Sequence, residues 1–133
     1  MRYLLDTNIL SVMARDPLGP LAKRLDGVGS EFVCTSIIVA AELRFWLAKG
    51  ASKRLWERVQ SFLERIEVLP FDAPADAAYG KIRSELERSG TLIGANDMFI
   101  AAHGLALGHT IVTDNVREFS RVEGLLVETW RRA

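Results

Sequence analysis

Cysteine and histidine are scarce in this chain of 133 residues, which contains only Cys34, His103 and His109. A single cysteine cannot form an internal disulfide, which favours a reducing compartment, and so small a supply of sulfur and nitrogen ligands argues against a dedicated zinc site. Uncharged runs, such as residues 32–41, fall short of the roughly 20 residues that a membrane span requires. A charge at Arg2 also interrupts any signal-peptide core. We therefore expect a soluble, cytoplasmic protein without a membrane segment.

An excess of charge of one sign is also missing, because 17 basic residues balance 17 acidic ones. The net charge alone therefore does not indicate a nucleic-acid-binding protein. If several of the acids gather in one pocket, however, the remaining surface is mildly basic. The length predicts one domain over residues 1–133, large enough to bury about two-thirds of its unfolded surface.

Short apolar runs alternate with helical patterns along the whole chain. This alternation predicts an α/β fold, with a parallel sheet of about five strands and helices on both faces. The first helix is expected to begin at Ile9, after a cap at Thr7 or Asn8. The expected strands are residues 2–5, 31–35, 67–69, 110–112 and 125–128. The expected later helices are a short one that ends at Leu25, residues 37–48, residues 53–66, one that Asp72 with Pro74 starts and Ser89-Gly90 ends, and residues 98–107.

Acidic residues occupy comparable places in this pattern. Asp6 and Asp114 follow predicted strands, Asp97 lies in the first turn of a helix, and Glu42 lies within an almost wholly apolar helix. The carboxyl ends of parallel strands share one edge of a sheet, where ligands bind in open α/β folds. We therefore expect these acids to converge there, with Asp97 kept ionised by the positive end of its helix.

Clustered carboxylates repel one another and need protons or cations to compensate their charge. An oxygen-only donor set suits Mg²⁺, with Mn²⁺ as a substitute. Such ions activate water and stabilise the leaving oxygen in phosphate chemistry. The chain has no Gly-x-x-x-x-Gly-Lys loop for a nucleotide, so the pattern favours cleavage of a phosphodiester over phosphoryl transfer from ATP.

The segments that carry these acids resemble the four motifs of PIN-domain nucleases, and are most similar to the VapC-type toxins of bacterial toxin–antitoxin pairs. They are residues 5–10, 35–43, 93–103 and 111–119. The resemblance implies a PIN-like three-layer sandwich with a five-stranded parallel sheet. It also implies a Mg²⁺-dependent endoribonuclease that cuts RNA such as a tRNA loop, inhibited by a VapB-type antitoxin whose tail enters the active-site groove.

The resemblance also assigns roles to individual residues. Asp6 and Asp97 match the acids most directly tied to metal, and Glu42 matches the third acid. Asp114 is the expected fourth ligand, with Asn115 and Glu118 as alternatives. Three further residues are expected to support the site or to have a purely structural role: Thr7 and Thr113 through hydrogen bonds, and Asn96 through substrate contact or capping.

Two other functions are compatible with the residues. One is an aspartyl-phosphate phosphatase with Asp6 as nucleophile, although Asn8 stands where such enzymes have a second acid. The other is a non-catalytic PIN-like module that binds a partner through its apolar helices. The apolar helix 37–48, with Trp46 and Trp56, offers enough hydrophobic surface for a homodimer or for an antitoxin.

Overall fold

Five short strands form one parallel sheet in the computed structural model, which describes residues 1–131. The strand order is β3-β2-β1-β4-β5, so the first strand lies at the centre. Leu5, the last residue of β1, lies opposite Thr35 of β2 and Val112 of β4. The strands are β1 (Tyr3–Leu5), β2 (Val33–Ser36), β3 (Glu67–Leu69), β4 (Thr110–Val112) and β5 (Val127–Glu128). The predicted parallel α/β sheet is therefore confirmed.

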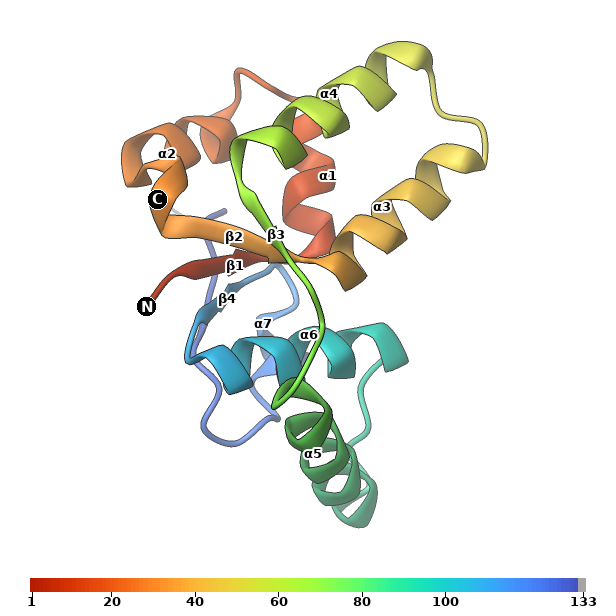
Figure 1. Ribbon diagram of the computed structural model, residues 1–133, viewed down its shortest axis with the longest axis vertical. Helices are drawn as coiled ribbons and strands as arrows, with labels where there is room; N and C mark the ends of the chain where they lie inside the picture. Colours follow the sequence, from red (N-terminus) through yellow and green to blue (C-terminus); the bar gives the residue numbers. More distant parts are fainter. Residues whose placement is uncertain (132–133) are drawn as a thin grey trace.

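The helices cover both faces of the sheet, which gives the predicted three-layer sandwich (Figure 1). One face carries α1 (Thr7–Arg15), α2 (Pro20–Val28), α3 (Ile37–Ala48) and α4 (Lys53–Arg65). The other carries α5 (Ala75–Ser89), α6 (Ala95–Leu107) and the short α7 (Val116–Phe119). In the described part of the chain, no helix is long and apolar enough to cross a membrane.

The central strands are inaccessible to solvent, as expected for a sheet with helices on both faces. Leu4, Val33, Cys34 and Ile111 are all fully buried. Burial raises the pKa of the Cys34 thiol to about 11, so it stays protonated at neutral pH. Since the thiolate is the reactive form, Cys34 is a small core residue, as the sequence indicated.

Some predicted boundaries were wrong, for local reasons. Helix α1 begins at Thr7 instead of Ile9, because the carboxylate of Asp6 caps it by accepting a hydrogen bond from the Thr7 backbone N–H at 2.8 Å. The second strand begins at Val33, since residues 30–32 form a 3₁₀ turn. The fifth strand is limited to Val127–Glu128.

Helix α3 is only partly covered within the chain. Val39, Ala40, Leu43 and Leu47 pack into the core, but Phe45 remains 67% exposed. The described residues thus leave part of this apolar helix uncovered. An apolar face of this kind is typical of a surface that contacts another molecule.

Candidate active site

Asp6 lies at the carboxyl end of the central strand and is held by contacts to both of its carboxylate oxygens. Oδ1 accepts a hydrogen bond from the Thr7 backbone N–H, and Oδ2 accepts one from Thr113 Oγ1, each at 2.8 Å. Thr113 Oγ1 in turn accepts a hydrogen bond from the Asn115 backbone N–H at 2.9 Å. Asp6 is only 3% exposed. It therefore both caps α1 and presents a fixed carboxylate at the sheet edge.

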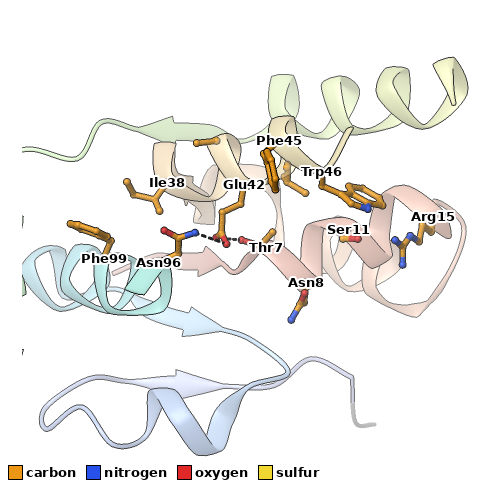
Figure 2. Close-up of a pocket in the computed structure, with 12 residues that line it drawn as sticks. Thr7, Asn8, Ser11, Arg15, Ile38, Glu42, Phe45, Trp46, Asn96 and Phe99 are labelled. Atoms are coloured by element: carbon orange, nitrogen blue, oxygen red, sulfur yellow. Dashed lines mark hydrogen bonds between the residues drawn. The ribbon is translucent and has the colours of Figure 1, made fainter. Parts of the chain in front are cut away.

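Glu42 connects three helices through its carboxylate. Oε1 accepts a hydrogen bond from Thr7 Oγ1 of α1 at 2.7 Å, and Oε2 accepts one from Asn96 Nδ2 of α6 at 3.1 Å. Figure 2 shows both contacts converging on Glu42. An acid in an apolar helix was expected to need a partner, and Thr7 and Asn96 supply it.

Asp97 lies in the first turn of α6, as predicted, but its electrostatic setting differs from the expectation. Its pKa is raised to about 6, first by desolvation and then by the carboxylates of Asp6, Glu42 and Glu118. A hydrogen bond from the Asn115 side chain opposes this rise. Burial and like charges thus outweigh the helix N-terminus in setting the pKa of Asp97.

The pKa of Asp6 is raised as well. Burial is the main cause, and the carboxylates of Glu42 and Asp114 add to it, while the hydrogen bonds from Thr113 and Thr7 lower it. These mutual effects place the acidic groups within electrostatic range of one another. The fold thus brings together acids from four separated segments, as the sequence predicted.

The two neighbouring candidates for the fourth position of this cluster, Asp114 and Asn115, make different contacts. Asp114 Oδ1 lies 3.5 Å from Nε of Arg131, whereas the neighbouring Asn115 contacts Asp97. Glu118, one turn further on in α7, is close enough to raise the pKa of Asp97. The Arg131 ion pair was not anticipated, because nothing in the local sequence indicates where the end of the chain returns to the sheet.

The donor set fits a hard divalent cation. The converging side chains offer carboxylate and amide oxygens only, which is the chemistry that Mg²⁺ and Mn²⁺ prefer. Within residues 1–131, no three acidic, histidine or cysteine side chains stand ready as a complete metal site. Glu42 is turned toward Thr7 and Asn96, and Asp114 toward Arg131, which leaves Asp6 and Asp97 as the central pair.

A groove of about 660 Å³ opens beside the acids, between α1, α3 and α6. Glu42, Thr7 and Asn96 line its middle, with Phe99 toward one end and Arg15 toward the other (Figure 2). Several lining residues were not singled out from the sequence: Ser11, Arg15, Ile38, Phe45 and Phe99. The signal that identifies one wall is the spacing of Thr7, Ser11 and Arg15, since residues four apart share one face of a helix.

Both histidines have the structural roles expected for them. His103 is buried, with Nδ1 2.8 Å from Ser36 Oγ, and burial lowers its pKa. His109 Nδ1 accepts a hydrogen bond from the Arg2 backbone N–H at 3.2 Å. Neither contact involves the acidic cluster.

Comparison with known proteins identifies similar chains over nearly the full length. The family model of the PIN domain matches residues 3–125. "Ribonuclease VapC2" of Rickettsia felis is 36% identical over 132 residues, which cover 98% of each chain. "tRNA(fMet)-specific endonuclease VapC" of Salmonella typhimurium is 34% identical over 131 residues, again covering 98% of each chain.

Solved structures agree with these sequence matches. A crystal structure of VapBC2 from Rickettsia felis bound to a DNA fragment from their promoter contains a chain that superposes with a TM-score of 0.89. That chain is 34% identical, and the match covers 98% of the present chain and 99% of the other. A DNA-bound VapBC structure from Salmonella typhimurium also gives a TM-score of 0.89, at 33% identity and 98% coverage of both chains.

Proposed function

The chain belongs to the PIN-domain family and, within it, to the VapC ribonucleases, and from this premise we propose that it is a Mg²⁺-dependent endoribonuclease toxin. Its substrate in this proposal is tRNA or a similarly structured RNA in the cytoplasm. The observation that carries the proposal is that Asp6 and Glu42 lie within electrostatic range of Asp97, and that Glu42 lines a surface groove. A cluster of carboxylates is unfavourable in itself, so its presence beside a groove indicates function rather than stability.

In this mechanism Asp6 and Asp97 would hold the cation, and Glu42 with one of Asp114, Asn115 or Glu118 would complete the set. When bound, Mg²⁺ or Mn²⁺ supplies a water of lowered pKa and stabilises the oxygen that leaves the phosphodiester. The supporting residues fix the acids. Thr113 Oγ1 and the Thr7 backbone N–H orient Asp6, and Thr7 Oγ1 and Asn96 orient Glu42. All four contacts are hydrogen bonds of 2.7–3.1 Å.

Among residues that could complete the site, Asn115 and Glu118 have the contacts that fit best. Both act on Asp97, whereas the Asp114 carboxylate is paired with Arg131. For Asp114 to serve as a ligand, this ion pair must be exchanged for the cation. An exposed pair of this kind contributes little stability, so the exchange is energetically feasible.

A VapB-type antitoxin is the partner that the structural relatives indicate, since their structures are described as VapBC complexes. In our proposal the antitoxin inhibits cleavage by covering the groove and the adjoining exposed apolar surface of α3. Ile37 is 46% exposed and Phe45 67% exposed, which leaves hydrophobic area available for burial. The remaining apolar positions on the surface supply the contacts of a homodimer.

The two alternative functions fit the site less well. An aspartyl-phosphate phosphatase has a second acid two residues after its nucleophile, whereas Asn8 stands at that position in this chain. Asn8 also points away from Glu42 (Figure 2). A non-catalytic module would gain nothing from a cluster in which burial and nearby carboxylates raise the pKa values of Asp6 and Asp97.

The direct test uses the chain freed of any antitoxin by unfolding and refolding. It is incubated with total cellular RNA in Mg²⁺, in Mn²⁺ and in excess chelator, and the new RNA ends are mapped. We expect discrete cleavage sites in structured RNA with either metal and none with chelator. Cleavage that persists in chelator contradicts the metal mechanism, and an absence of cleavage under every condition contradicts the nuclease.

A further inference from the structure

Helix α1 forms a polar wall that leads away from the acids along the groove. Thr7, Ser11 and Arg15 are four residues apart, and all line the groove together with Asn8. At 1.5 Å per residue, Arg15 lies about 12 Å along the helix from Thr7. Figure 2 shows Ser11 and Arg15 following Thr7 along α1, away from Glu42. A strand that crosses the acids and continues along this wall reaches Arg15 within a few nucleotides.

Arg15 carries a charge that no neighbouring acid neutralises. Its guanidinium lies over the ring of Trp46 in α3, 4.6 Å from the ring centroid, and within residues 1–131 it makes no ion pair. The side chain is exposed at the groove surface. Stacking on an aromatic ring limits the rotamers of a long side chain and therefore lowers the entropy lost when it binds an anion.

The other wall of the groove is apolar. Ile38 and Phe45 come from α3, and Phe99 comes from α6 (Figure 2). A single RNA strand has the matching division, because its phosphates lie on one side and its unstacked bases can lie against aromatic side chains on the other. The groove thus offers a cationic contact on the α1 side and base-sized apolar surface on the opposite side.

We propose that Arg15, held against Trp46, binds a backbone phosphate of the RNA strand a few nucleotides away from the one that is cleaved. This inference rests on the proposed nuclease function and adds to it a residue that positions the substrate at a distance from the acids. It also specifies the form of the substrate at this point as unpaired nucleotides, because the bases must leave their stack to contact the apolar wall.

The test compares Arg15→Gln with Arg88→Gln, a matched loss of one exposed arginine on α5, on the other face of the sheet. Cleavage kinetics are measured with an RNA that the unsubstituted chain cuts, over a series of salt concentrations. For Arg15→Gln we expect KM to rise about tenfold with kcat unchanged, and the salt slope of log KM to fall by about 0.7, the value for one single-strand phosphate contact. Arg88→Gln leaves both quantities unchanged.

A conservative variant separates charge from stacking. Arg15→Lys keeps the phosphate contact but loses the planar stacking on Trp46, so it is expected to restore the salt slope and only part of the affinity. Equal KM and salt slope in the two glutamine variants overturn the inference and leave the nuclease proposal intact. A loss confined to kcat, or confined to inhibition by the antitoxin, overturns it as well. If the unsubstituted chain cleaves no RNA, the nuclease proposal fails and this inference fails with it.

Discussion

Replacing Asp97 with Asn lowers RNA cleavage by more than about 100-fold, which exceeds the 10–100-fold effect typical of residues that only support a metal ligand. Asn keeps the shape of the side chain and removes one negative charge from the centre of the acidic cluster. Asp97 is the group on which the carboxylates of Asp6, Glu42 and Glu118 all act. Its charge is therefore the one that cation binding depends on most. Initial rates at saturating Mg²⁺ measure the effect.

The matched control is Asp76→Asn, which removes an exposed acid from the first turn of α5, as Asp97→Asn removes an acid from the first turn of α6. The control should cleave RNA at the unsubstituted rate. Circular dichroism and the cooperativity of unfolding should be the same for both variants. If Asp97→Asn retains cleavage within a few-fold of the control, Asp97 is not a metal ligand.

The same substitution stabilises the protein at neutral pH. The pKa of Asp97 is about 6 in the folded chain, against an ordinary value of 3.8. The folded state therefore binds this proton more tightly, so the contribution is fully present below about pH 4 and is lost as the pH rises through 6. With allowance for solvent screening of a half-buried group, the loss is on the order of 1–2 kcal/mol.

Urea unfolding at pH 4 and pH 7.5 measures this effect in the absence of divalent cations. The free energy of unfolding of Asp97→Asn should exceed that of the unsubstituted chain at pH 7.5, and the difference should shrink toward zero at pH 4. Comparison of the two chains cancels the titration of the other acids. A difference of the same size at both pH values would show that repulsion and burial of the Asp97 charge are not its cause.

Much of this site could be predicted because its residues stand at the ends of regular elements. An acid directly after a buried strand, such as Asp6, is placed at the sheet edge by the strand itself. Ser36 caps α3 and fixes the position of Glu42 on that helix in the same way. Strand and helix periodicity are local properties, so they determine which side chains reach the edge before any tertiary contact is known.

The remaining features depend on contacts between distant segments. The Asp114–Arg131 ion pair requires the path of the chain after β5, and the raised pKa of Asp97 requires the number of acids around it. From the sequence, Asp6 suits either a helix cap or a catalytic role. One carboxylate serves both, because the cap to the Thr7 backbone N–H uses only one lone pair of Oδ1. Thr7, Ser11 and Arg15 have the spacing of one face of any amphipathic helix. That spacing indicates a binding surface only once Arg15 is seen to stack on Trp46.

The central claim is that acids from separate segments form one site for a divalent cation. The most direct measurement is titration of Mn²⁺ into the antitoxin-free chain at pH 7.5, followed by electron paramagnetic resonance of the free ion. We expect saturable binding by the unsubstituted chain and by Asp76→Asn, competed by Mg²⁺ and lost in Asp97→Asn. Equal Mn²⁺ binding by Asp97→Asn and the unsubstituted chain would contradict the claim.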